Sequence, residues 1–269
     1  MSPLQAVVLG AIQGLTEFLP VSSSGHLVWV PWILGWEAPG LAFDAVLHLG
    51  TLGAVLAYFR SDLGRIVVAG VRFLRDPSHR ADPDGRTAWL IVVATLPAAI
   101  IGLAAADLLE ELFENPGAVG WALIATGLLL LWGERVRRGG REASQLRVWE
   151  ALAVGAGQAL ALFPGISRSG ATIAAGLWRG LDRRDAARFS FLLAVPAVLG
   201  AGILQGLALL SEGDPEAGWA LALGFASALA SGYAAIRVLL RYLQRRSLLP
   251  FAGYCLVLGA VLAALYARG

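Results

Sequence analysis

Two stretches of the sequence gather residue types that could handle a phosphate group. The first, QGLTEFLPVSSSGHL, runs from Gln13 to Leu27 and contains an acid, three serines and a histidine. The second, QALALFPGISRSGAT, runs from Gln158 to Thr172 and contains an arginine between two serines. Hydroxyls, an acid or base, and a planar guanidinium are the parts of a phosphoryl-transfer site, where positioning and charge stabilisation do most of the catalysis.

The first stretch holds the groups that would carry the reaction. Gln13 and Glu17 are four residues apart and would share one face of a helix. Ser23 is a candidate nucleophile, which needs a neighbouring base, and His26, three residues further on, could turn toward it. Equally, Glu17 or His26 could activate a water molecule for direct attack. The sequence does not choose between these routes.

The second stretch holds Arg168, the expected phosphate clamp. A charged residue inside an apolar hairpin is costly and therefore indicates function. The alternative is that Arg168 pairs with Glu17 only to hold the two stretches together. The other expected phosphate-binding positions carry an amide, a hydroxyl or a glycine: Gln13, Ser22, Ser24, Gly165, Ser167, Ser169, Gly170 and Thr172.

The composition places both stretches in a membrane protein. Of the 269 residues, 57% are hydrophobic and only 15% are charged, whereas soluble domains are typically about 25% charged. The net charge of +2 gives no reason to expect a nucleic acid partner. Membrane lipid is the expected surrounding.

Six apolar segments are long enough, or nearly so, to cross a bilayer, which takes about 20 residues in a helix. They lie near 42–59, 87–106, 116–133, 187–210, 217–240 and 250–267. Two further apolar stretches, 3–36 and 146–180, are interrupted at Pro20 and at Pro164. Proline ends a helix and the serines that follow can cap a new one, so each stretch predicts a re-entrant helix–loop–helix hairpin.

The two hairpins belong to a predicted inverted repeat. Aligned without gaps, Gln13, Ser22 and Gly25 match Gln158, Ser167 and Gly170, each pair 145 positions apart. By the positive-inside rule, the arginine-rich loops at 60–86 and 134–147 are cytoplasmic and the acidic segment 107–114 is outside. The first hairpin must then open outward and the second toward the cytoplasm.

These observations predict an all-α integral membrane protein built as one domain, 1–269. Repeat 1 covers 1–133 and repeat 2 covers 146–269, each a hairpin followed by three spans, and chance matching of small residues is the alternative. Such repeats bring broken helices together near the bilayer midplane. Two helix N-termini at one point favour an anion.

The segments EFLPVSSSGH and PGISRSGAT resemble the signature motifs of the bacterial undecaprenyl-pyrophosphate phosphatases of the bacitracin-resistance type. The resemblance covers essentially the whole chain, including FDAVLHLGT and FSFLLAVPA. It implies an enzyme of the bacterial cytoplasmic membrane that hydrolyses undecaprenyl diphosphate to the monophosphate and phosphate, recycling a cell-wall lipid carrier. Its active site would open to the outer face. The motif positions that the family links to catalysis or phosphate binding are here Glu17, Ser23, His26, Ser167, Arg168, Ser169 and Thr172.

The resemblance also implies a divalent cation. The motifs contain one acid, so Mg²⁺ or Ca²⁺ would be held by Glu17, water and the phosphates of a polyprenyl diphosphate substrate, with no cage of several acids. Small residues on the helices leave a homodimer open. The alternative function is an inverted-repeat transporter or a polyprenyl-phosphate flippase, because fold alone does not fix function. Asp44 and His48 are four apart, which favours a structural hydrogen bond over a proton relay.

Overall fold

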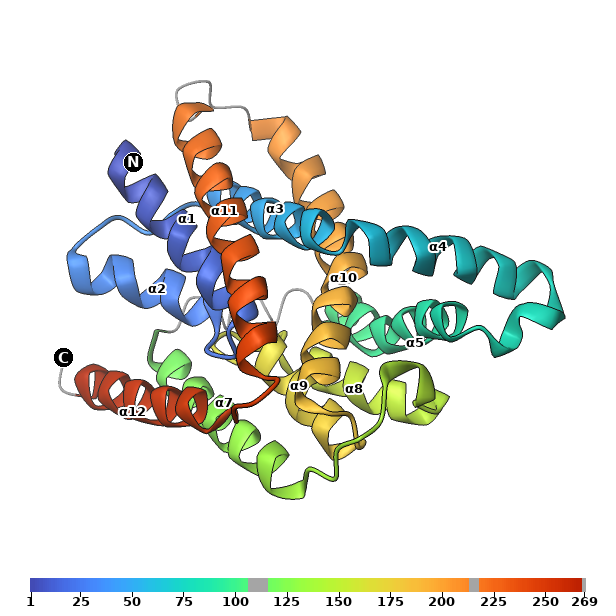
Figure 1. Ribbon diagram of the computed structural model, residues 1–269. Helices are drawn as coiled ribbons and strands as arrows, with labels where there is room; N and C mark the ends of the chain where they lie inside the picture. The colour runs from blue at the N-terminus through green and yellow to red at the C-terminus, as the bar shows by residue number, and fades with distance from the viewer. Residues whose placement is uncertain (106–115, 213–217, 268–269) are drawn as a thin grey trace.

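The computed structural model describes residues 1–105, 116–212 and 218–267 (Figure 1). Within these ranges the chain is helical and contains no strand, apart from an isolated bridge between Arg141 and Leu181. The helices are α1 (Pro3–Phe18), α2 (Ser23–Leu34), α3 (Leu41–Tyr58), α4 (Arg60–Arg75), η1 (Pro77–Ala81), α5 (Pro83–Ala104), α7 (Pro116–Val136), η2 (Ala143–Gln145), α8 (Val148–Leu160), α9 (Arg168–Trp178), α10 (Arg183–Glu212), α11 (Gly218–Tyr242) and α12 (Leu249–Tyr266). The all-α prediction is confirmed.

Four described helices are long and apolar enough by themselves to cross a membrane. They are α5, residues Ala118–Val136 of α7, α11 and α12. Residues Ala42–Tyr58 and Arg60–Arg75 pass the same test only together, as a pair bent by 82°. The predicted spans coincide with α3, α5, α7, α10, α11 and α12, but the count of six is not established. The predicted acidic outer segment, 107–114, lies within 106–115, outside the described residues.

Both predicted hairpins are helix–loop–helix units. The first is α1 and α2, and the second is α8 and α9. Helix α1 ends at Phe18, just before Pro20, and α8 ends at Leu160, before Pro164. The breaks follow from proline chemistry, because a proline cannot donate the amide hydrogen that continues a helix.

Segment 60–86, predicted as an arginine-rich loop, contains helix α4 and the short helix η1 instead. Ile66 and Ala69 are buried in α4, whereas Val67, Val68 and Val71 are exposed. A hydropathy average over such a segment is low because arginines alternate with apolar residues, yet the apolar residues still form helical faces. Figure 1 shows α4, η1 and α5 extending together to one side of the molecule.

Each hairpin packs against the other half of the chain. Helix α1 lies along α11, and α8 lies along α5 (Figure 1). The contact between α1 and α11 is close because a Cβ on Gly10 or Gly14 would collide with α11. Small residues at such crossings let helix backbones approach. The largest core cluster includes Phe18 at the end of α1, whose ring meets Phe191 edge-on at 5.2 Å. The end of the first hairpin helix is therefore fixed in the core.

Candidate active site

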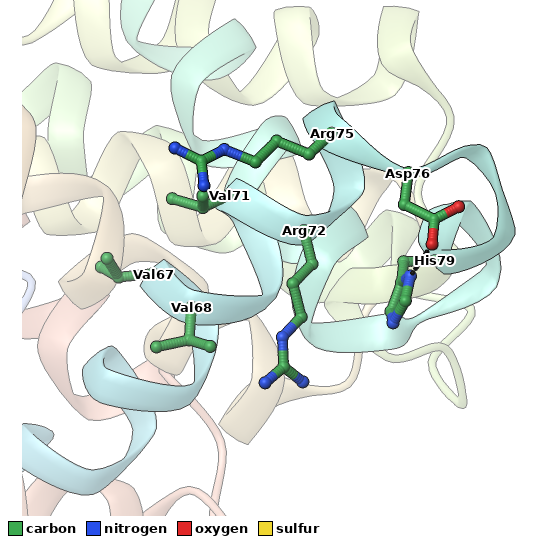
Figure 2. Close-up of a pocket in the computed structure, with 7 residues that line it drawn as sticks. All are labelled: Val67, Val68, Val71, Arg72, Arg75, Asp76 and His79. Atoms are coloured by element: carbon green, nitrogen blue, oxygen red, sulfur yellow. Dashed lines mark hydrogen bonds and ion pairs between the residues drawn. The ribbon is translucent and has the colours of Figure 1, made fainter.

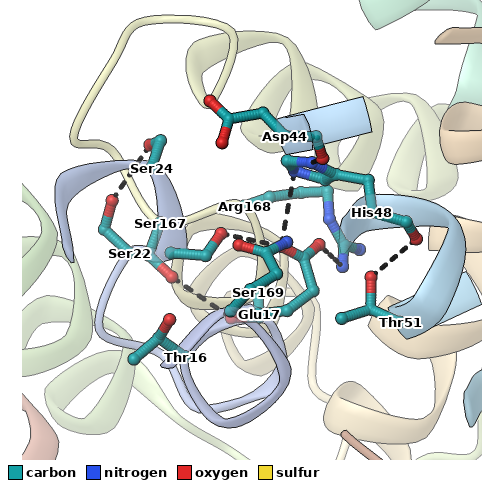
Figure 3. Close-up of polar contacts among 12 residues, drawn as sticks. Thr16, Glu17, Ser22, Ser24, Asp44, His48, Thr51, Ser167, Arg168 and Ser169 are labelled. Carbon is teal, nitrogen blue, oxygen red and sulfur yellow. Dashed lines mark hydrogen bonds and ion pairs between the residues drawn. The ribbon is translucent and has the colours of Figure 1, made fainter. Parts of the chain in front are cut away.

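Side chains from the tips of the two hairpins lie next to one another (Figure 3). Arg168 at the start of α9 donates from Nη2 to Glu17 Oε1 at 3.0 Å. Ser169 donates from Oγ to the Leu19 carbonyl oxygen at 3.2 Å. The Gly165 amide donates to Ser24 Oγ at 3.3 Å. The structure thus brings together residues about 140 to 150 positions apart, as the repeat predicted.

The two tips have the same local structure. Ser22 caps α2 by accepting the Gly25 amide, and Ser167 caps α9 by accepting the Gly170 amide. In each tip the capping hydroxyl also bonds the hydroxyl of the serine two residues after it. The oxygen–oxygen distances are 3.3 Å for Ser22 and Ser24 and 3.1 Å for Ser167 and Ser169. The 145-residue spacing found in the sequence therefore corresponds to a repeated hydrogen-bond pattern.

Each tip also has one residue at positive φ. Ser22 has φ of 69°, a conformation that costs a non-glycine residue roughly 1–3 kcal/mol. Gly165 has φ of 88°, and a Cβ there would lie 2.8 Å from Ala122 Cβ on α7. Glycine at 165 thus serves close packing of the second tip on α7, while the strain at Ser22 lies beside Ser23.

Glu17 is the acceptor at which the polar contacts converge. It is 7% exposed. Its Oε2 accepts from Ser23 Oγ at 2.7 Å and from Gln13 Nε2 at 3.1 Å, and its Oε1 accepts from Arg168. A carboxylate this close to a serine hydroxyl is placed to take its proton. Ser23 itself is partly exposed, so the pair faces an accessible space.

Arg168 is held from two sides. While Nη2 bonds Glu17, Nη1 donates to the Ser190 carbonyl oxygen of α10 at 3.1 Å. Thr172 binds the Arg168 carbonyl oxygen and Ser190 Oγ, both at 2.7 Å. Thr126 Oγ1 of α7 accepts the Ser167 amide at 3.0 Å. Thr172, a predicted phosphate ligand, therefore contacts the residues that support Arg168.

Four backbone amides at the tips are unsatisfied. The N–H groups of Ser23, Ser24, Arg168 and Ser169 have no acceptor among the described residues. They are the first-turn amides that a helix cannot bond internally. Together with the Arg168 guanidinium they make the meeting point of α2 and α9 suited to an anion.

His26 does not bond Ser23 in the structure. Its Nδ1 lies 2.7 Å from the Ser22 carbonyl oxygen, and its Nε2 lies 2.7 Å from the Tyr254 hydroxyl of α12. A carbonyl oxygen only accepts, so Nδ1 carries a hydrogen. The predicted role of His26 in proton transfer stays a prediction. Tyr254 was not identified from the sequence, because nothing in the sequence connects it with His26, 228 positions away.

His48 is the imidazole nearest to Glu17. Its Nε2 lies 3.9 Å from Glu17 Oε2 (Figure 3). Its Nδ1 bonds the backbone oxygen of Asp44 at 2.8 Å, so Nδ1 carries the hydrogen and Nε2 faces Glu17. The favoured structural hydrogen bond between Asp44 and His48 is present, although it uses the backbone and not the carboxylate. The FDAVLHLGT segment could have drawn attention to His48, but only the fold places it here.

The described residues contain no group of three or more histidine, cysteine, aspartate or glutamate side chains that could hold a metal ion. Glu17 is the carboxylate at the tips, and its oxygens already accept from three side chains. This donor set fits a cation that brings most of its ligands with it, as water and phosphate oxygens. It does not fit a cage made by the protein.

Two cavities lie away from the residues of the tips. One, of about 470 Å³, lies along α4 and is lined by valines together with Arg72, Arg75, Asp76 and His79 (Figure 2). Within it His79 Nδ1 lies 3.1 Å from Asp76 Oδ2. The other, of about 490 Å³, lies at the base of the second hairpin. Neither contains a residue of the tips.

Comparison with known proteins gives consistent matches over nearly the whole chain. A family profile described as "Bacitracin resistance protein BacA" matches residues 6–261. An undecaprenyl-diphosphatase of Rubrobacter xylanophilus is 48% identical over 265 residues, covering 97% of both chains. Undecaprenyl-diphosphatases of Moorella thermoacetica and of a Nocardioides species are 43% and 45% identical, covering 99% of this chain and 98% and 97% of theirs.

Proposed function

The chain belongs to the family of the bacitracin resistance protein BacA, and on this premise we propose that it hydrolyses undecaprenyl diphosphate to undecaprenyl phosphate and inorganic phosphate. It is thus an integral membrane enzyme that recycles the lipid carrier of cell-wall synthesis and confers bacitracin resistance. The observation that carries the assignment in this chain is the cluster of Glu17, Ser23 and Arg168 across the two tips.

The geometry supports attack by Ser23. Its oxygen would bond the terminal phosphorus of the diphosphate while its proton passes to Glu17 Oε2, 2.7 Å away. The bond between that phosphorus and the bridging oxygen breaks, and undecaprenyl phosphate leaves with the electron pair. A water molecule then cleaves the serine phosphate, releasing inorganic phosphate and restoring the hydroxyl. In the alternative route Glu17 activates a water molecule that attacks the same phosphorus directly.

Arg168 and the four tip amides would hold the non-bridging phosphate oxygens. The guanidinium charge and the amide dipoles are in place before substrate binds. They can therefore stabilise the negative charge that develops in the transition state without reorganisation of the site. Gln13 and Ser190 keep the Glu17 and Arg168 side chains in position through hydrogen bonds at 3.1 Å. The substrate phosphate would compete with Glu17 for the Arg168 guanidinium. Substrate binding would therefore free the Glu17 carboxylate from its ion pair.

The membrane arrangement we propose is the inverted repeat of the sequence analysis, in the bacterial cytoplasmic membrane with the tips open to the outer face. It is supported by the helix packing. Helix α1 of the first half packs on α11 of the second, and α8, the counterpart of α1, packs on α5, the counterpart of α11. Like helices of the two halves also pair, α3 with α10 and α7 with α12. The prenyl tail would remain in lipid while its diphosphate reaches the tips.

The reaction should need a divalent cation, held with the substrate by Glu17. When bound, the cation neutralises phosphate charge. We expect purified protein in detergent to release phosphate from undecaprenyl diphosphate with Mg²⁺ or Ca²⁺, to stop in EDTA, and to recover when either ion is restored. The apparent metal affinity should rise with substrate concentration, because phosphate oxygens supply most ligands.

Two outcomes would count against this account. Tight stoichiometric metal binding without substrate would mean that the protein supplies a full ligand set. If the wild-type protein releases no phosphate with either ion present, the hydrolase assignment fails and a transporter or polyprenyl-phosphate flippase remains.

His26 and His48 should differ in their importance for the reaction. We expect His48→Gln to lower kcat by about 10²-fold, the range of a lost acid–base group, because His48 Nε2 lies 3.9 Å from Glu17. Tyr254→Phe removes the partner of His26 Nε2 and should lower kcat by less than about tenfold. Steady-state phosphate release measures both variants. If Tyr254→Phe lowers kcat as much as His48→Gln does, the result would favour His26 as the residue that transfers the proton.

A further inference from the structure

The base of the second hairpin carries a second site of positive charge. The cavity of about 490 Å³ opens there, between the end of α7 and the two outer ends of α8 and α9. Its charged lining residues are Arg138, Arg141, Glu150 and Arg179. Three arginines and one glutamate give the lining a net charge of +2.

Arg141 and Glu150 neutralise each other and form the wall of this cavity. The Arg141 Nη1 and Nη2 atoms donate to the two carboxylate oxygens of Glu150 at 2.8 and 2.9 Å. Nη1 also donates to the Arg179 carbonyl oxygen at 2.7 Å. These bonds tie the chain before α8 to the end of α9. Because its donors are occupied within the protein, Arg141 is a structural residue here.

Arg179 is positioned without an acceptor. Its guanidinium carbon lies 3.5 Å from the ring centroid of Trp178 and 4.8 Å from that of Trp149. Its Nε is buried and bonds nothing, and the other N–H groups of the guanidinium have no acceptor among the described residues. Buried donors are nearly always paired. A guanidinium fixed by two aromatic rings with unused donors therefore indicates an acceptor from outside the chain.

Trp149 and Trp178 also indicate where that acceptor would come from. Both rings are about half exposed, and Trp178 contacts Trp132 at 5.5 Å. Exposed tryptophans gather at the depth of lipid headgroups. Basic pockets between helices at that depth, on the arginine-rich side of the membrane, suit anionic headgroups. Arginine's planar fork matches a phosphate in particular.

We propose that this cavity binds the phosphate of an anionic phospholipid headgroup, with Arg179 as the main ligand and Arg138 at its rim. Arg138 is exposed and has no hydrogen bond or ion pair among the described residues. The ligand would contact the C-terminal end of α9, the helix whose first residue is Arg168. Headgroup binding would thus stabilise the hairpin that carries the phosphate clamp. The proposal does not depend on which reaction the tips perform.

The test measures lipid binding by the full-length protein in detergent, using native mass spectrometry with phosphatidylglycerol and phosphatidylcholine. We expect phosphatidylglycerol to bind the wild-type protein about tenfold more tightly than phosphatidylcholine. Arg179→Gln should remove that preference and Arg138→Gln should reduce it. Arg184→Gln, which removes an exposed arginine outside the cavity, should leave it unchanged. Thermal melting of each variant confirms that the fold is retained.

Three results would overturn the proposal. The first is a phosphatidylglycerol preference in Arg179→Gln and Arg138→Gln that equals the wild type. The second is that Arg184→Gln loses as much of the phosphatidylglycerol preference as Arg179→Gln does. That would mean that the total charge of the protein, and not this cavity, determines lipid binding. The third is complete displacement of phosphatidylglycerol by millimolar inorganic phosphate, which would make the ligand a free phosphate. Since the readout is lipid binding, none of these results bears on phosphate release.

Discussion

Replacing Arg168 with glutamine should lower phosphate release from undecaprenyl diphosphate by about 10³-fold or more, the effect of losing an arginine that stabilises a transferring phosphoryl group. Arg168 is the cation at the tips, and its guanidinium is held between Glu17 and the Ser190 carbonyl oxygen at 3.0 and 3.1 Å. Arg168→Lys should recover little of the loss, because an ammonium cannot make both contacts and also clamp phosphate. The rate at saturating substrate measures the effect.

The control for this prediction is a matched arginine elsewhere. Removing one partner of a buried ion pair can cost about 3–5 kcal/mol of stability, so lost activity must be separated from lost fold. Arg188→Gln breaks a 2.8 Å ion pair between α10 and Asp62 of α4 and should keep near-normal turnover. If Arg168→Gln, melting like the wild type, also keeps its turnover, then Arg168 only joins the hairpins.

Local features of the tips could be predicted from the sequence because they depend on nearby residues. Pro20 and Pro164 end helices through their own chemistry. Ser22 and Ser167 bond amides three residues away. Even the meeting of Glu17 with Arg168 could be expected, because the predicted inverted repeat would bring the two broken helices together.

The partners that complete the site could not be predicted, because they come from distant helices. Thr126 and Ser190 reach the second tip from α7 and α10, and Tyr254 reaches His26 from α12. Each is an ordinary residue in an apolar helix, and only packing gives it a role. His48 is similar: its spacing from Asp44 explains one hydrogen bond, while its approach to Glu17 depends on how α3 crosses α1.

Helix α4 shows that a segment rich in charged residues need not be a loop. Arginines favour a polar surrounding, but Arg65 pairs with Asp62 and Asp84 at 2.8 and 3.2 Å, and Arg188 pairs with Asp62. Ion pairs between helices thus allow a charged segment to remain helical and to pack against α5. The pairing depends on tertiary contact, which neither composition nor hydropathy contains.

Ser23→Ala and Glu17→Gln should together decide how the phosphate bond is attacked. If Ser23 is the nucleophile, we expect Ser23→Ala to lower kcat by about 10⁴-fold or more. Glu17→Gln should lower it by about 10²- to 10⁴-fold, because an amide cannot take the proton that the carboxylate accepts across 2.7 Å. Ser24→Ala removes the neighbouring hydroxyl, which accepts the Gly165 amide, and should cost only about tenfold.

Combining the two changes tests whether they act on one step. Residues that act as a unit have non-additive effects, so Ser23→Ala with Glu17→Gln should be about as slow as Ser23→Ala alone. Rapid-quench experiments on the wild-type protein should then trap phosphate on Ser23. Near-normal turnover of Ser23→Ala beside an inactive Glu17→Gln would exclude the serine route. In that case Glu17 delivers a water molecule, and the hydroxyl 2.7 Å from it serves to orient the carboxylate.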